Sequence, residues 1–494
     1  MSAQGLHQQH SGASGLDAVV ERVLEEVRRQ GGAAAGPVEA TARADRHRLA
    51  LTRFAGSGIH QNTEDDRTTV HLRVALDGGR SASVSTTRTT TTALADLVSA
   101  ALAAARLSPR DAAWPGLTGP VPEVGGAGPD DATASAGPAE RAALVAAFVE
   151  AAGGLETAGY AQTTLLTSAV ADTAGLHARA ASTGAVVDGI ARALPASGLD
   201  GSPGPSGDPS FRADGVGRAA SRSLADLDAA ALGARAARRA RAQAAPAQPL
   251  RRGELPVVLE PSAVLDVVAG LLSSTFSGRG LVEGTSGVRL GEQQLDPALT
   301  LVDDPLHPSS TALPFDTEGT PGCRTELVRD GVPRAVTTDR RTAAALAATR
   351  SGLPDLPTTA GAHDASDTWG PVAQAPVLSS GVGGSVDDLV AGLEHGLLVC
   401  DLWYTRLAEA KRSVWTGLTR NGTFLVRDGE VVGPVGVLRF TQSYLEALAP
   451  GAVVVGSQAE ALPRALTFGA SGTARVVVPP LRLARWNVTG GAAT

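Results

Sequence analysis

The stretch TTVHLRVALDGGRSASVST, residues 68–86, decides the fold class of the first half of this 494-residue chain. Between Val70 and Leu76 every second side chain is apolar, a pattern typical of a strand that buries one face. The DGG triplet at 77–79 predicts a tight turn, so residues 81–86 should return as the second strand of a β-hairpin. An antiparallel sheet is therefore the first element that the sequence predicts.

Helices are predicted on both sides of this hairpin. Upstream, apolar residues recur at helical spacing from Leu16 to Val27, whereas residues 1–15 are small and polar and are expected to be disordered. Downstream, the apolar residues from Leu94 to Leu102 share one helical face, and a run of threonines before them supplies an N-cap. The first half is thus predicted to be an α+β module.

The remainder of the first half alternates predicted elements with loops. A helix is expected at 138–152, and strands at 46–54 and 160–166. Two segments rich in Gly, Pro and Asp, 119–138 and 197–212, are expected to be loops. Residues 224–243 are rich in Ala and Arg, which favours a helix with a solvated basic face over a binding surface. We place the first domain at 16–245.

From residue 250 to 494 the pattern favours a second, β-rich domain. A short apolar strand at 255–259 precedes a helix at 261–275. Further short strands, separated by Gly, Asp and Pro, are predicted at 300–302, 396–403, 423–427, 435–441 and 453–456. Asp428-Gly429 is a typical hairpin turn. Strands at this spacing predict a twisted sheet or a partial barrel.

Composition excludes several classes of protein. Lys and Arg number 43 against 50 Asp and Glu, and without a basic patch this balance argues against a nucleic-acid partner. No apolar run reaches the length of a membrane-spanning helix, and the N-terminus lacks the pattern of a secretory signal. Cys323 and Cys400 are too few for a disulfide framework or a four-thiolate zinc site. We therefore expect a cytoplasmic protein without a membrane partner.

The sequence contains no strong catalytic motif. None of the nine histidines forms the helical His pair with an adjacent Glu that builds a zinc peptidase site. Two acidic groups, Asp303-Asp304 and Asp316 with Glu318, could do acid–base chemistry or bind a hard cation. The segment FDTEG at 315–319 is interpreted more simply as a turn.

Several segments in the second half resemble the TldD/PmbA family of metallopeptidases. They are PVVLEPSAVLDVV (256–268), LVDDP (301–305), FDTEGTP (315–321), RDGV (329–332), GLLVCDLWYTR (396–406), TGLTRNGTFLVRDGEVVGPV (416–435) and LRFTQS (438–443). The first half resembles the family more loosely, through GSGIHQN at 56–62. The resemblance implies a two-domain α+β fold, with an N-terminal α/β sandwich-type domain and a β-rich C-terminal domain.

The resemblance also distinguishes two branches of this family. The TldD branch resembles a zinc peptidase with a helical HExxxH motif and a C-terminal cysteine ligand, whereas the TldE (PmbA) branch lacks these ligands and pairs with TldD. In this chain the motif position falls on AGLLSS at 269–274, which has neither imidazole nor carboxylate, and residues 462–480 contain no Cys, His or Asp. The chain therefore resembles the TldE branch.

This resemblance implies a non-catalytic subunit of a heterodimeric zinc peptidase that processes unstructured or modified peptides, including precursors of peptide natural products. No cofactor is expected in this chain, and zinc is expected in a TldD-type, HExxxH-bearing partner. The candidate residues for contact with substrate or partner are Asp303, Asp304, Asp316, Glu318, Arg420 and Arg439. The alternatives are a stand-alone or homodimeric peptide-binding scaffold, and an enzyme that uses the acidic cluster with another metal.

Overall fold

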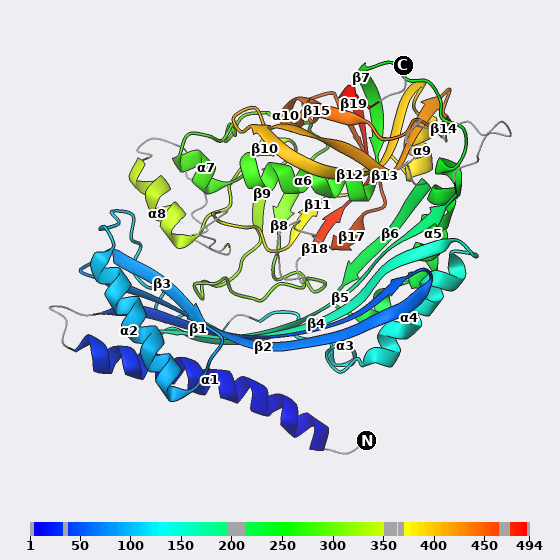
Figure 1. The fold of residues 1–494 in the computed structure, drawn as a ribbon. Coiled ribbons are helices and arrows are strands. Elements are labelled where there is room, and N and C mark those ends of the chain that lie inside the picture. Colours follow the sequence, from blue (N-terminus) through cyan, green and yellow to red (C-terminus); the bar gives the residue numbers. More distant parts are fainter. Residues whose placement is uncertain are drawn as a thin grey trace.

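The structure is a computed structural model that describes residues 4–32, 38–123, 125–194, 213–349, 363, 370–463 and 475–491. Its first half is one antiparallel sheet in the order β3-β2-β1-β4-β5-β6. The strands are β1 (Glu39–Ala55), β2 (Gly58–Leu76), β3 (Arg80–Thr86), β4 (Glu156–Asp172), β5 (His177–Ala193) and β6 (Ala213–Ser221). The long strands curve together, and the second half of the chain lies on their concave side (Figure 1).

Helices cover the convex face of this sheet. They are α1 (Gln4–Gly31), α2 (Thr91–Leu107), α3 (Asp131–Ala134), α4 (Pro138–Ala151), the 3-10 turn η1 (Leu224–Asp226) and α5 (Ala229–Gln243). Val70, Leu72 and Val74 of β2 are almost fully buried in the core beneath α1 and α2, as their alternation predicted. Because the facing positions of β1 are alanines, the helices can pack close to the strands.

The predicted hairpin and helix cap at this sheet are confirmed. Leu76 pairs with Arg80 across the turn, and Asp77, Gly78 and Gly79 all have positive φ. Thr90 accepts a hydrogen bond from the backbone N–H of Ala93 and so caps α2. The local turn and cap chemistry therefore determines this part of the fold.

Three expectations differ from the structure. The helix α1 begins at Gln4, so the residues before Leu16 extend a helix where disorder was expected, because polar residues can continue a helix that is nucleated downstream. The loop at 119–138 contains the single turn α3. The strands β5 and β6 were not predicted, and the expected loop at 197–212 lies outside the described residues.

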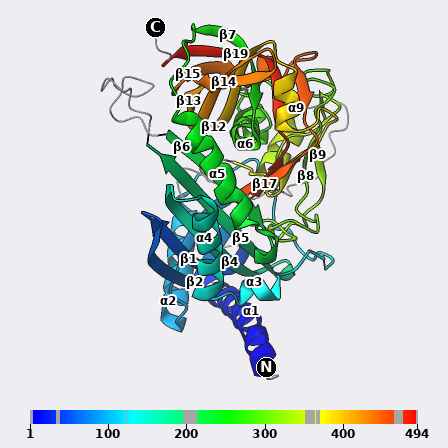
Figure 2. The ribbon, with the colours of Figure 1, turned by 90° about the vertical axis from the view of Figure 1, so that its right-hand side faces the viewer.

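The helix α5 differs in part from its prediction, because Arg238 and Arg241 are exposed whereas Arg235 and Arg239 are held in ion pairs. Arg235 forms an ion pair with Glu460 at 2.6 Å, and Arg239 pairs with Glu260. Both carboxylates belong to the second half of the chain. Figure 2 shows α5 running from the sheet toward the strands above it. The arginine run therefore connects the two halves.

The second half contains two further sheets. The first has the order β10-β9-β8-β11-β18-β17, from β8 (Leu301–Asp303), β9 (Thr325–Arg329), β10 (Val332–Pro333), β11 (Pro376–Leu378), β17 (Glu460–Pro463) and β18 (Arg475–Val478). The second contains β7 (Gly253–Leu259), β12 (His395–Glu409), β13 (Val414–Arg427), β14 (Glu430–Pro434), β15 (Arg439–Ser443), β16 (Val453–Val455) and β19 (Leu481–Gly490).

The second of these sheets closes into a barrel. β12 pairs with both β7 and β13, and the path from β7 through β19 and β15 returns to β13. The predicted partial barrel is therefore a closed ring of strands. The Asp428-Gly429 turn joins β13 to β14, with Arg427 opposite Glu430, as predicted.

Helices complete the second half. They are α6 (Pro261–Ser274), α7 (Gly278–Val282), α8 (Arg340–Thr349), α9 (Val386–Ala391) and α10 (Tyr444–Ala447). The predicted helix at 261–275 is thus α6, which packs its apolar side into the core that it shares with the barrel strands. The mixed α+β architecture with a β-rich second half is confirmed.

Candidate functional site

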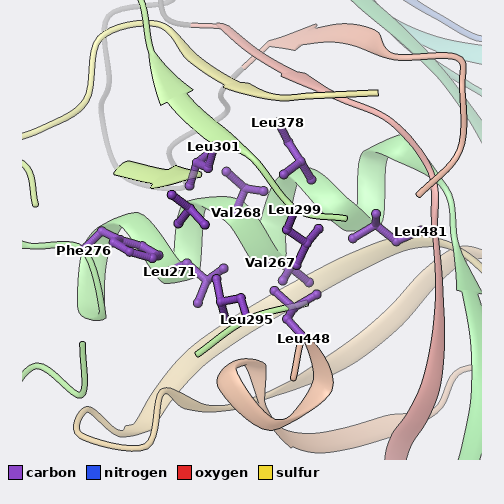
Figure 3. Close-up of a pocket in the computed structure, with 11 residues that line it drawn as sticks. Val267, Val268, Leu271, Phe276, Leu295, Leu299, Leu301, Leu378, Leu448 and Leu481 are labelled. Carbon is purple, nitrogen blue, oxygen red and sulfur yellow. The ribbon is translucent and has the colours of Figure 1, made fainter. Parts of the chain in front are cut away.

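The helix α6 lies where the resemblance places the metal motif of the TldD branch. Val267, Val268 and Leu271 on its buried side line a small cavity together with apolar side chains from the surrounding strands and loops (Figure 3). This cavity has no polar lining, so it belongs to the core. Asp266, Ala269 and Ser273 fall at helical spacing outside that buried stripe; Asp266 and Ala269 are half-buried and Ser273 is exposed.

Aromatic packing occupies the motif position on α6. A Cβ atom added at Gly270 would lie 2.7 Å from Cε2 of Tyr444 and 3.0 Å from Cε2 of Trp415. The rings of Trp415 and Tyr444 are stacked with their centroids 5.7 Å apart. The hydroxyl of Ser274 donates to the carbonyl of Gly270 at 2.8 Å. Residues 269–274 therefore bring backbone atoms and aromatic rings together and include no imidazole or carboxylate.

These groups do not fit a zinc ion. Zinc sites in proteins use thiolate, imidazole or carboxylate ligands, and residues 269–274 provide none of them. Across the ranges that the structure describes, no three or more His, Cys, Asp or Glu side chains are grouped so that they could hold a metal ion. We therefore derive no catalytic step through zinc for this chain.

One titratable group lies beside this face. The carboxylate of Asp266 accepts a hydrogen bond from the hydroxyl of Thr405 at 2.9 Å and one from the phenol of Tyr444 at 3.4 Å. Burial raises the pKa of Asp266 to about 6, and the negative charge of Asp401 adds to this effect. Asp266 is the only charged residue in the α6 sequence, a signal that the sequence analysis missed.

A second polar group joins the sheet to the barrel. Arg218 of β6 lies 3.3 Å from Asp401 of β12 (Nη2 to Oδ2) and 3.4 Å from Asp188 of β5 (Nε to Oδ1). The amide of Asn421 donates to the same Oδ2 atom of Asp401 at 2.8 Å. Burial opposes the charge of Arg218, but the two carboxylates hold its pKa above its usual value. The arginine is thus clamped between two strands of different sheets.

The phenol of Tyr160 on β4 belongs to the same junction. Burial and the nearby carboxylate of Asp188 raise its pKa to about 12. Burial also raises the pKa of Asp401, against the opposing charge of Arg218. The junction is therefore a buried, charge-paired connection, and its groups stabilise the arrangement of the two halves.

Exposed aromatic side chains lie on β12 next to this junction. Trp403 is 45 % exposed and Tyr404 is 61 % exposed. The guanidinium of Arg420 lies over the ring of Trp403, and that of Arg406 over the ring of Tyr404, each with Cζ 4.4 Å from the ring centroid. The site thus combines a buried ionic centre with an accessible surface of rings and guanidinium groups.

The structure gives Asp303 a role in backbone binding. Its carboxylate accepts hydrogen bonds from the N–H groups of Gln374 (3.0 Å) and Ala375 (2.5 Å), and Nε2 of His363 lies 3.5 Å away. These contacts engage both carboxylate oxygens of a side chain that is almost fully buried. The neighbouring Asp304 is half-buried, with Arg324 at 3.9 Å.

The acidic pair Asp316 and Glu318 shapes a turn, as the simpler interpretation predicted. Oδ1 of Asp316 accepts hydrogen bonds from the N–H groups of Glu318 and Thr320, both at 2.8 Å. Glu318 pairs with Arg73 of β2 at 2.7 Å and accepts from the N–H of Arg340 at 3.1 Å. Burial raises the pKa of Glu318, against the opposing charge of Arg73. This turn connects the second half to the sheet.

The two remaining candidates, Arg420 and Arg439, are exposed on β13 and β15 of the barrel. The six candidate residues therefore occupy three regions: strand β8, the turn after it, and the barrel surface. The groups at the junction, Arg218, Asp401 and Asp188, were missed because no local pattern connects them; Arg218 and Asp401 are separated by 183 positions in the chain.

The described helices agree with the absence of a long apolar run in the sequence. None of the helices that the structure describes is both long enough and apolar enough to cross a membrane. The expected location of the protein therefore remains a sequence-based prediction.

Solved structures share this fold over nearly the full chain. TldE from Thermococcus kodakarensis is 19% identical, with a TM-score of 0.76 over 95% of this chain and 100% of that one. A candidate modulator of DNA gyrase from Thermotoga maritima is 17% identical, with a TM-score of 0.75 over 96% and 100%. Another, from Bacteroides thetaiotaomicron, is 17% identical, with a TM-score of 0.72 over 96% and 98%. At these identities the likeness shows the fold alone.

Sequence families give a more specific result. No curated protein matches the chain. Residues 252–490 match the PmbA/TldA metallopeptidase C-terminal domain. Residues 40–105 match PmbA/TldA metallopeptidase domain 1. The two matches fall in the expected order and include the barrel, α6 and the first hairpin, so the chain belongs to the PmbA/TldD metallopeptidase family.

Proposed function

We propose that this chain is the TldE-like, non-catalytic subunit of a TldD/TldE zinc metallopeptidase heterodimer. The observation that carries the proposal is the face of α6 at residues 269–274, which holds a glycine against two aromatic rings instead of zinc ligands. The fold around this helix is nevertheless shared with TldE over 95% of the chain. A chain that keeps the fold and lacks the ligands is suited to a supporting role.

The missing chemistry would come from the partner. A peptidase zinc polarises the scissile carbonyl and activates a water molecule, and both tasks need a ligand set with an open coordination position. We assign that set to a TldD-type paralogue with an HExxxH motif. This chain would contribute the opposite wall of the space in which the peptide is cleaved.

The substrate class follows from the same proposal. An unstructured peptide can bind in extended form, with its backbone hydrogen bonds supplying most of the affinity. Arg420 and Arg439 are the candidate contacts that remain accessible. We assign Asp303, Asp316 and Glu318 to the support of the surrounding loops, because their carboxylates bind backbone N–H groups or Arg73.

Reconstitution tests this function. The chain and an HExxxH-bearing paralogue from the same genome are purified separately and mixed, and cleavage of an unstructured fluorogenic peptide is followed. We expect activity in the mixture alone, and its loss when the Glu of the partner's HExxxH motif is changed to Gln. Cleavage by this chain alone would contradict the proposal.

The same experiment separates the alternative function. If the two proteins do not associate and this chain still binds peptides as a monomer or homodimer, then it is a peptide-binding scaffold. Size-exclusion chromatography with light scattering on the mixture distinguishes a heterodimer from separate proteins.

A further inference from the structure

We propose that the outer face of the β12–β13 hairpin binds the carboxylate of an extended peptide. The site is Trp403, Tyr404, Arg406 and Arg420, which we name the Trp-Arg patch. The inference rests on the proposed function, since it specifies the kind of peptide that this subunit would hold. It adds a defined recognition element on this chain's own side of the complex.

The register of the two strands places the patch. Residues 401–403 of β12 pair with β13 without a register shift, so the side chains of Asp401 and Trp403 share one face, and Arg420 is the register partner of Asp401. Leu402, between them, is buried in the barrel core on the other face. Because Asp401 contacts Arg218 of β6, the patch lies on the side of the barrel that meets the N-terminal sheet.

The part of the chain that the structure describes leaves the rings of Trp403 and Tyr404 partly uncovered. Trp403 and Tyr404 are 45 % and 61 % exposed, and Leu407 on the same strand is 43 % exposed. The chain has only five Trp and three Tyr residues. Two adjacent aromatic side chains that stay exposed forgo the stabilisation that their burial would give to a core poor in aromatics. Apolar surface of this kind, bordered by charges, is typical of a binding site.

The backbone holds Tyr404 in an unfavourable conformation. Its φ is 55°, in the left-handed region that a bulky residue seldom adopts. A bulge interrupts the pairing between Trp403 and Arg406, and this bulge reorients the side chains of the strand. Such strain persists where the surrounding structure imposes it, and it is concentrated at ligand-binding positions.

The charge of the patch selects the ligand. Arg218 is held between two carboxylates, whereas Arg420 makes no ion pair within the ranges that the structure describes. The guanidinium of Arg420 lies over the Trp403 ring, with Cζ 4.4 Å from its centroid, and the arginine is exposed, so its N–H groups can reach an anion at this surface. A carboxylate can accept two parallel hydrogen bonds from a guanidinium.

A peptide offers this carboxylate from two sources, its C-terminus or an Asp or Glu side chain. In either case a neighbouring apolar or aromatic residue could pack on the exposed rings of Trp403 and Tyr404. The ligand class is therefore an extended peptide in which a carboxylate lies beside an apolar side chain.

Fluorescence anisotropy with three labelled decapeptides tests this inference. The first has neutral side chains, a penultimate Phe and a free C-terminal carboxylate. The second is its C-terminal amide, and the third is the amide with an internal Phe-Glu pair. Binding is measured with the full chain, and again with its complex with a partner inactivated at the HExxxH glutamate.

We expect the first or third peptide to bind at least tenfold more tightly than the second, and the identity of the tighter peptide gives the source of the carboxylate. Arg420→Met should weaken that binding by about ten- to hundredfold, as expected for loss of a charge-assisted pair. The affinity of Arg420→Lys for that peptide should lie between those of the unmodified chain and Arg420→Met, because lysine keeps the charge and loses the bidentate geometry. Trp403→Leu should weaken binding of all Phe-containing peptides.

Arg427→Met is the matched control, because Arg427 is an exposed arginine on the same strand β13. It should bind all three peptides like the unmodified chain, and every variant should retain the circular dichroism spectrum and melting temperature of that chain. Equal affinity for the three peptides, or an unchanged affinity in Arg420→Met, would overturn the inference. Neither result depends on cleavage, so failure of the patch is distinguishable from failure of the proposed heterodimer.

Discussion

The guanidinium of Arg218 in β6 lies 3.3 Å from the carboxylate of Asp401 in β12, and this buried ion pair fastens the N-terminal sheet to the barrel. The same arginine pairs with Asp188 of β5. Because both partners of a buried pair depend on each other, loss of Arg218 leaves two carboxylates without their counter-charge.

Arg218→Met should therefore lower the free energy of unfolding by about 3–5 kcal/mol at pH 7. The measurement is a urea denaturation series followed by fluorescence and by circular dichroism. The double variant Arg218→Met/Asp401→Asn should recover part of the loss, since it removes one of the two orphaned charges. Arg439→Met, at an exposed position, should change stability by less than about 0.5 kcal/mol. A loss in Arg218→Met no larger than in this control would show that the pair does not connect the halves.

The raised pKa of Asp266 predicts a pH dependence of stability. Its pKa of about 6 in the folded chain exceeds the ordinary aspartate value of 3.8, so the folded state holds this proton more tightly than the unfolded state. The stabilising contribution is complete below about pH 4 and is lost as the pH rises through 6, a change of up to about 3 kcal/mol.

Asp266→Asn should abolish this component. The difference in unfolding free energy, unmodified chain minus variant, should thus decrease between pH 4 and pH 7. Denaturation curves for both proteins at half-unit intervals of pH provide the measurement. A difference that stays constant over this range would mean that Asp266 titrates normally.

Gly270 should tolerate no side chain. The Cβ of alanine would lie 2.7 Å from a ring carbon of the buried Tyr444, so Gly270→Ala should cost about 1–3 kcal/mol through overpacking. Gly15→Ala is the matched control, because Gly15 lies in α1 with no atom within 4 Å of an added Cβ, and alanine there should stabilise the helix by up to about 1 kcal/mol. In thermal melts, the melting temperature should therefore fall in Gly270→Ala and rise in Gly15→Ala. Equal stability of Gly270→Ala and the unmodified chain would refute the tight packing at the motif position.

The first hairpin and the helix α6 could be predicted because each has a strong local pattern. Alternation from Val70 to Leu76 and the glycine turn specify a hairpin without any tertiary information. By contrast, β5 was missed because its sequence is dominated by small residues such as Ala and Gly, which have low strand propensity. The face of β5 on the convex side of the sheet packs against α4 and α5, and this tertiary packing overrides the low strand propensity of its residues.

The candidate site was only partly predictable for the same reason. Arg420 was identified from a family segment, and its partner Trp403 stands in another such segment. The pairing of Arg218 with Asp401 and of Arg239 with Glu260 depends on how the halves dock, and no local pattern encodes that. The solvated helix face expected at 224–243 holds only in part, because the carboxylates that pair with Arg235 and Arg239 are distant in sequence.

The central claim is that this chain carries no catalytic zinc and depends on a partner that does. The most direct test is the zinc content of the chain, purified alone without chelator and measured by elemental analysis. The account predicts a zinc-to-chain ratio near zero, while the complex with an HExxxH-bearing paralogue should contain one zinc per heterodimer. A ratio near one for the isolated chain would contradict the account, because it would require a ligand set that α6 does not provide.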